Sequence, residues 1–218
     1  MERRYSELRG YLALARIRAV YQTVAAIAAI TALGWIVGGR EFHVHQESDF
    51  AVPWLILLPF GSAAAIAASL ESEVTVWEAA SPRLVGRLVG AFVLALTGVA
   101  AVGVAVDTAG LSGPYSLPTA LRNLFAFLGA GLICGRAFGP RLSWLAPLVW
   151  ALASLTVGSG ADNAGVTRIA IWAWPLLPDG GSAAIPASTA TIGSAALFIF
   201  GLAASCHVRA GTSRNRWL

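Results

Sequence analysis

The chain has 218 residues, of which 57% are hydrophobic and 12% charged, with a formal net charge of +4. A water-soluble domain carries charge on about a quarter of its residues. The composition therefore excludes a soluble globular protein and indicates an integral membrane protein. Every basic residue is an arginine, and the arginines lie beside apolar stretches, which excludes a nucleic-acid-binding protein with a continuous basic surface.

The first eighteen residues are charged throughout and include the sequence ERRYSELRGYLALARIR. Tyr5, Leu8, Leu12 and Ala15 recur at the spacing of one helix face, and arginines are available for the opposite face. Residues 1–18 are therefore predicted to form an amphipathic helix that lies in the membrane interface.

Long uncharged stretches predict six membrane-spanning helices, because about 20 apolar residues are needed to cross the hydrocarbon core. The predicted spans cover about residues 19–39, 52–70, 86–106, 118–135, 142–159 and 186–206. Arg122 lies in the first turn of the fourth span, and we expect its long side chain to reach the interface. Asp107 flanks the same outer loop and is its expected ion-pair partner. The predicted fold is all-α, a single transmembrane domain over residues 1–218.

The distribution of arginine predicts that both termini are cytoplasmic. In that orientation only three arginines fall outside the membrane, at positions 40, 122 and 168. The other twelve fall on the inner side, at positions 3, 4, 9, 16, 18, 83, 87, 136, 141, 209, 214 and 216. This excess follows the positive-inside rule and predicts a multi-pass protein of a plasma membrane.

A polar segment, REFHVHQESDF, follows the first predicted span. His43 and His45 share one face if the segment is extended, and Glu47 and Asp49 lie close by in sequence. Imidazole nitrogens beside carboxylates are suitable ligands for Zn or Cu. The alternative is a solvated outer loop that holds no metal.

Between the second and third predicted spans, the stretch ESEVTVWEAASPRLVGR changes from acidic to basic. Ser81 is a favourable helix N-cap and Pro82 a favourable first helical residue, so a helix is predicted to begin there and to continue through Arg83.

The acidic half of this stretch, residues 71–80, cannot enter lipid because it carries Glu71, Glu73 and Glu78. A helix of two or three turns lying flat on the inner face would expose Trp77 as an anchor and the carboxylates as partners for a basic groove. This is one interpretation. The other is a solvated loop whose Trp77 rests at the level of the lipid headgroups.

Between the fifth and sixth spans, the loop contains the apolar run IAIWAWPLLP, which is about half the length of a span. We expect this run to enter the edge of the membrane and return, with both tryptophans at the interface. Its central residues are Ile171, Trp172, Trp174, Pro175 and Leu176.

Polar and small residues within the spans are expected to serve helix packing. Hydroxyl groups such as those of Thr97, Thr156 and Thr191 are predicted to bridge helices, and Gly129 and Gly131 to allow close approach. The spans carry no ionisable group at mid-depth, which disfavours proton- or ion-coupled transport.

The order of these segments resembles the membrane subunits of type-2 ABC exporters, the ABC-2 permease family. The matching segments are ERRYSELRGYLALARIR, ESEVTVWEAASPRLVGR and TRIAIWAWPLLPDGG. The resemblance implies an interfacial helix and six spans. It also implies a cytoplasmic coupling helix between spans two and three and a re-entrant gate between spans five and six. The coupling residues would be Glu71, Glu73, Trp77, Glu78 and Arg83.

The resemblance implies a non-catalytic subunit in a bacterial plasma membrane. It would move a hydrophobic or amphipathic substrate, such as a peptide, antibiotic or lipid-like molecule, beside a second permease, identical or paralogous. The chain has no lysine and hence no P-loop, so ATP and Mg would be bound by two copies of a separate ABC ATPase subunit. The alternatives are a structural or assembly subunit of another membrane complex and, less favoured, an intramembrane enzyme.

Overall fold

The computed structural model describes residues 20–36, 41–43, 51–53, 58–70, 82–109, 116–157, 159–161, 167–169, 172–177 and 186–206. Six helices lie in these ranges: Val20–Ile36, α2 Leu58–Ala68, α4 Pro82–Thr108, α5 Leu117–Phe138, α6 Leu145–Val157 and α7 Ala187–Cys206. Two 3-10 turns are η2 Pro140–Leu142 and η3 Trp174–Leu176. Two antiparallel hairpins pair β1 Glu41–His43 with β2 Ala51–Pro53, and β3 Ser159–Ala161 with β4 Thr167–Ile169.

Each range predicted to span the membrane overlaps one of the six described helices. Three of them, α4, α5 and α7, are long and apolar enough to cross a bilayer, which indicates a membrane protein. The other three are apolar but shorter. The second predicted span begins too early, because residues 51–53 pair with β1 and the helix starts only at Leu58. The helix predicted to begin at Pro82 does begin there.

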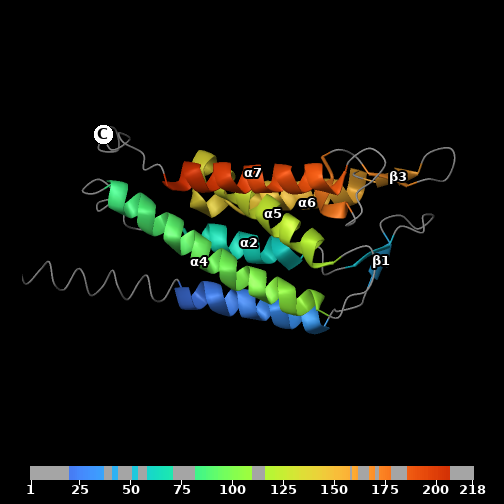
Figure 1. The fold of residues 1–218 in the computed structure, drawn as a ribbon, viewed down its shortest axis with the longest axis horizontal. Coiled ribbons are helices and arrows are strands. Elements are labelled where there is room, and N and C mark those ends of the chain that lie inside the picture. Colours follow the sequence, from blue (N-terminus) through green and yellow to red (C-terminus); the bar gives the residue numbers. More distant parts are fainter. Residues whose placement is uncertain are drawn as a thin grey trace, which may run out of the picture.

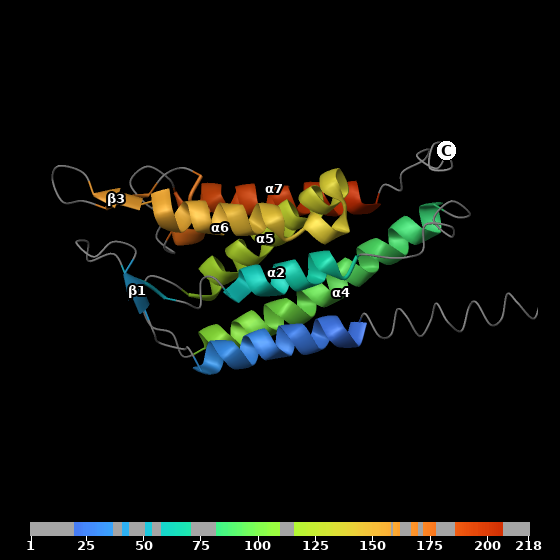
Figure 2. The same cartoon turned by 180° about the vertical axis from the view of Figure 1, so that it is seen from behind.

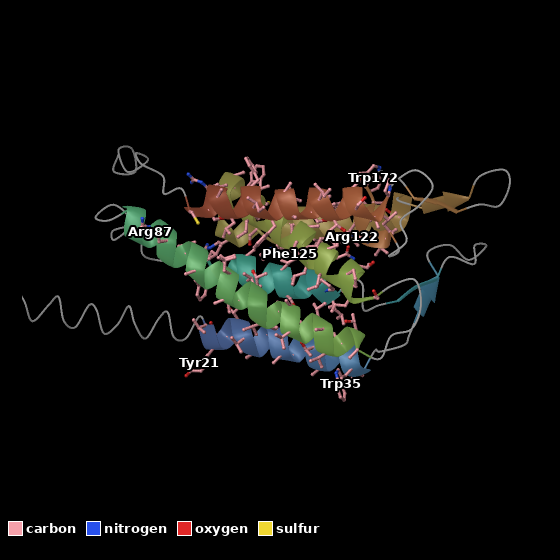
Figure 3. The ribbon with its side chains drawn as sticks, in the orientation of Figure 1. Tyr21, Trp35, Arg87, Arg122, Phe125 and Trp172 are labelled. Atoms are coloured by element: carbon pink, nitrogen blue, oxygen red, sulfur yellow. The ribbon has the colours of Figure 1, made fainter. Side chains whose placement is uncertain are left out.

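Successive helices run in opposite directions along the long axis of the bundle (Figure 1). Both hairpins lie at the same end, which we call the hairpin end; the view from behind gives the same arrangement (Figure 2). Arg87 lies near the opposite end (Figure 3). Arg136 in the last turn of α5 and Arg141 in η2 also belong to that end, so we call it the arginine end.

Helix α5 is the centre of the bundle. It packs most extensively against α7 and α2, and Leu124, Phe127 and Leu128 on it are fully buried. The Phe127 ring contacts Phe60 of α2 and Trp150 of α6 edge to face, with ring centroids 5.9 and 5.8 Å apart. Because α5 packs against α2, α4, α6 and α7, polar side chains on it can reach the interior of the fold.

The crossing of α5 and α7 depends on glycine. A Cβ on Gly129 would lie 2.6 Å from the carbonyl carbon of Leu197, and a Cβ on Gly201 would lie 2.7 Å from the Gly129 oxygen. At Gly131 a Cβ would lie 3.2 Å from the Ala67 Cβ. The predicted close packing at Gly129 and Gly131 is therefore confirmed.

The predicted bridging role of the span hydroxyls is wrong at three positions. Thr97, Thr156 and Thr191 each donate to the carbonyl oxygen four residues earlier in their own helix, at 2.7, 2.9 and 2.9 Å. A threonine hydroxyl in an apolar surrounding takes the nearest acceptor, which is the preceding turn. The printed hydrogen bonds of these three hydroxyls therefore lie within their own helices and do not join one helix to another.

Candidate functional site

The segment Trp172–Leu177, which we call the docked segment, lies between β4 and α7. It is not α-helical: Trp172 is in a turn, and η3 is held by a bond from the Leu176 amide to the Ala173 oxygen at 3.0 Å. Ala173, Pro175, Leu176 and Leu177 are buried, whereas Trp172 is 43% exposed. Ile171 and the side chain of Trp174 lie outside the described residues.

Two side chains of α5 bind the carbonyl oxygens of the docked segment. The Arg122 guanidinium donates to the Leu177 oxygen, and Asn123 Nδ2 donates to the Pro175 oxygen at 3.0 Å. Both donors are buried. A non-helical backbone away from water needs such partners, since each unsatisfied carbonyl in an apolar medium costs several kcal/mol (order of magnitude).

A third donor comes from α6. Trp150 Nε1 donates to the Trp172 oxygen at 2.7 Å, while its ring packs on Phe127 of α5. We call Arg122, Asn123 and Trp150 the carbonyl-binding trio. Arg122 and Trp172 lie together at the hairpin end (Figure 3). The trio thus ties the docked segment to two helices that are themselves packed together.

Arg122 does not extend to the interface as expected. It is 3% exposed and faces the docked segment. Asp107 is not placed as its partner but lies against Gly34 of the Val20–Ile36 helix, where a Cβ would be 2.8 Å from its carboxyl group. The physical reason is that the carbonyl oxygen of Leu177, 55 residues further along the chain, accepts a hydrogen bond from the guanidinium.

The local sequence explains how α5 presents these two donors. Ser116 is the N-cap and a proline follows in the first turn, which explains why the helix starts here. This start lies at the hairpin end (Figure 1). Arg122 and Asn123 then fall in the second turn, on the buried side together with Thr119 and Ala120. An arginine and an asparagine one turn inside an apolar helix were the available signal for this site, since intramembrane polar residues mark functional positions.

The coupling residues of the sequence analysis are only partly described. Glu71, Glu73, Trp77 and Glu78 lie outside the described residues. Arg83 lies in the first turn of α4, where its side chain is not described. The docked segment and the start of α4 are at opposite ends of the bundle (Figure 1). A movement at the start of α4 could therefore reach the docked segment only along the helices.

The histidine segment is described only at its start. His43 lies in β1 opposite Ala51, and His45 lies outside the described residues. In the part of the chain that the structure describes, no three His, Cys, Asp or Glu residues cluster in a way that could hold a metal ion.

Comparison with known proteins does not identify a family for this chain. No family model, no curated protein and no solved structure matches this chain.

Proposed function

We propose that this chain is the permease subunit of an ATP-driven exporter of the ABC-2 kind. In this proposal it lies in a bacterial plasma membrane with both termini cytoplasmic and six membrane-spanning helices. It moves a hydrophobic or amphipathic substrate. ATP and Mg are bound by two copies of a separate ATPase subunit, and a second permease, identical or paralogous, forms the other half of the pathway.

The observation that carries the proposal is the docked segment. A short non-helical run between the fifth and sixth helices, with its carbonyl oxygens bound by Arg122, Asn123 and Trp150, has the properties of a re-entrant element. Side-chain hydrogen bonds from Arg122, Asn123 and Trp150 help to hold the segment, and breaking them does not require a helix to unfold. That is what a gate between helices requires.

Two further features support the proposal. Successive helices alternate in direction, as in a multi-pass permease (Figure 1). Helix α4 has 27 residues, about 40 Å, which exceeds the hydrocarbon thickness by roughly a third. The stretch of α4 that is apolar enough to cross is Val89–Thr108, so in this proposal the first turns, with Arg87 exposed, extend beyond the bilayer. A push on these first turns would act on a rigid helix that runs the length of the bundle.

The partner assignment is tested by purifying the tagged full-length chain in mild detergent and identifying co-purified proteins by mass spectrometry. We expect an ATPase with a P-loop in the wild-type sample, and its loss with Trp77→Ala or Glu78→Arg. The matched control is Trp144→Ala, which removes an exposed tryptophan near η2 at the same arginine end.

Two outcomes would contradict the proposal at different points. If an ATPase co-purifies equally with both variants, residues 71–80 are not the coupling element. If no ATPase co-purifies and the membranes show no ATP turnover that depends on this chain, it is not a permease subunit. A stable complex with other membrane proteins would then favour the structural or assembly role.

A further inference from the structure

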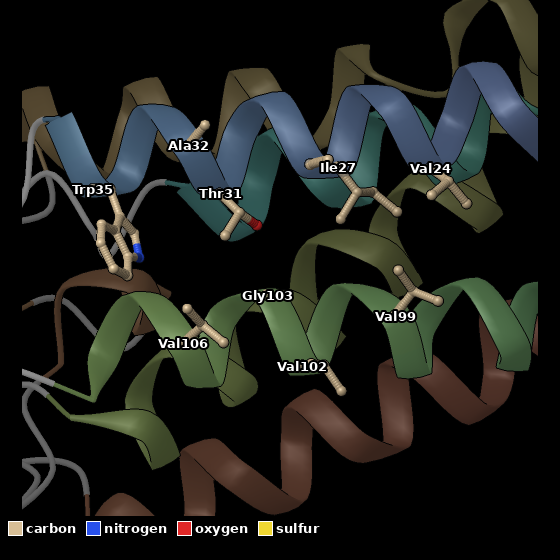
Figure 4. A pocket seen from close by; sticks show the side chains of 10 residues that line it. Val24, Ile27, Thr31, Ala32, Trp35, Val99, Val102, Gly103 and Val106 are labelled. Atoms are coloured by element: carbon tan, nitrogen blue, oxygen red, sulfur yellow. The ribbon is translucent and has the colours of Figure 1, made fainter.

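The open apolar groove between the Val20–Ile36 helix and α4, of 540 Å³, has no charged residue in its described lining (Figure 4). It therefore does not discriminate between one apolar ligand and another. The site that holds the docked segment is different, because buried polar side chains there bind particular atoms of what the site holds. Its occupant shows which chemistry the site accepts.

The carbonyl-binding trio donates to the main-chain oxygens of residues 172, 175 and 177, all within one short segment. These bonds recognise atoms that every peptide carries, and not the side chains of one sequence. Two of the donors, Arg122 and Asn123, are 3% and 0% exposed, so they meet the carbonyl oxygens away from water. Such a set of donors can bind the backbone of another apolar peptide in the same non-helical conformation.

Apolar side chains complete the fit of the docked segment to its site. Ala173, Leu176 and Leu177 are fully buried. Pro175 is also buried and has no amide hydrogen, so it leaves no main-chain donor without an acceptor at this point. The site therefore accepts an apolar, proline-containing peptide and holds it by its carbonyl oxygens.

The charge of Arg122 adds a preference at the last position of the site. Its guanidinium donates to the oxygen of Leu177, which is a neutral carbonyl within the chain. A separate peptide that ended at this position would present a carboxylate to the same guanidinium. Hydrogen bonds between ionised partners are shorter and stronger, and the arginine fork matches both carboxylate oxygens. A free C-terminus would therefore bind here more tightly than Leu177 does.

We infer that the docked segment occupies the binding site of an apolar peptide, and that a peptide of the same length with a free C-terminal carboxylate displaces it. The carboxylate binds Arg122, and two carbonyl oxygens bind Asn123 and Trp150. The inference rests on the proposed export function and narrows the substrate class to peptides. Because the displaced segment is the moving part of the proposed gate, peptide binding and gate opening are one event.

The test uses the full-length chain in nanodiscs of phosphatidylcholine. The probes are two N-acetylated peptides with the sequence of residues 172–177, WAWPLL, of which one ends in a carboxylate and the other in an amide. Equilibrium dialysis measures binding, and partition into empty nanodiscs is subtracted. We expect the acid to bind about tenfold more tightly than the amide. We also expect it to speed hydrogen exchange in residues 172–177 of the protein.

Substitutions of Arg122 test the assignment of the carboxylate. Arg122→Leu is expected to reduce the ratio of acid to amide affinity to about one, and Arg122→Lys to keep part of the preference. The ratio compares two ligands on the same protein, so a general loss of stability does not imitate this effect. Arg87→Leu is the matched control, since it removes an exposed arginine near the opposite end of the bundle and should leave the ratio unchanged.

Three results would overturn the inference. Equal affinity of the wild-type protein for the acid and the amide would remove the role of the carboxylate. A preference for the acid that persists in Arg122→Leu would place the carboxylate elsewhere. Binding that leaves hydrogen exchange in residues 172–177 unchanged would mean that the peptide does not displace the docked segment.

The peptide site and the proposed function fail separately. If an ATPase co-purifies but neither peptide binds, the exporter proposal stands and the peptide inference is wrong. If the acid binds with the expected dependence on Arg122 but no ATPase is found, the docked segment covers a peptide site in a protein of another function.

Discussion

The indole nitrogen of Trp150 lies 2.7 Å from the carbonyl oxygen of Trp172, 22 residues further along the chain. The same indole ring packs on Phe127 in the centre of the bundle. One side chain therefore connects the buried core to an exposed turn. The hydrogen bond and the packing can be separated experimentally, because phenylalanine retains a ring but has no donor.

The first prediction concerns this bond. In Trp150→Phe we expect faster amide exchange in the peptide that covers residues 172–177, and a loss of about 1 kcal/mol in stability. Hydrogen exchange with mass spectrometry measures the first effect. Trp144→Phe, at an exposed position outside the site, is the control and should leave that peptide unchanged. Unaltered exchange in Trp150→Phe would show that the bond does not hold the segment.

The second prediction concerns Arg122. Arg122→Leu removes a charged donor and leaves the Leu177 oxygen without it, so we expect a loss of about 2 kcal/mol in the free energy of unfolding. Arg122→Lys retains a charge and a donor and should recover part of that loss. Thermal unfolding in detergent measures both. If lysine were no better than leucine, the donor would not be the reason for the effect.

The third prediction concerns the crossing of α5 and α7. Gly129→Ala places a methyl group 2.6 Å from the Leu197 backbone and should cost about 1–3 kcal/mol, because neither helix backbone can yield locally. Gly98→Ala is the matched control. Nothing lies within 4 Å of its added carbon, so higher helix propensity should leave stability unchanged or improve it by up to about 1 kcal/mol.

The fourth prediction concerns orientation. Trp35 is 72% exposed near the hairpin end, and Arg87 is exposed near the arginine end. In a background with Cys134 and Cys206 replaced by serine, Trp35→Cys should react with an impermeant maleimide in intact cells. Arg87→Cys should react only after the membrane is opened. The reverse pattern would invert the topology and place residues 71–80 outside.

Parts of the candidate site could be predicted from the sequence. The apolar run at 169–178 stood out between two spans because its length is about half of what a crossing needs. Its partners could not be predicted. Arg122 and Asn123 lie more than 50 residues from the carbonyl oxygens that they bind. No local pattern connects these donors with their acceptors. Asp107 is closer to Arg122 in sequence, but the ion pair expected between them is wrong.

The sequence by itself determined the class of the protein and the positions of its apolar helices, because hydropathy and helix-start signals are properties of neighbouring residues. The tertiary structure alone decided which polar groups contact one another. Arg122 donates to the carbonyl oxygen of Leu177, the threonine hydroxyls donate to carbonyl oxygens of their own helices, and the Asp107 carboxyl group faces Gly34. Such partnerships depend on how the helices are rotated and where they cross. Those properties arise from packing between segments far apart in the chain, at contacts such as Gly129 against Leu197.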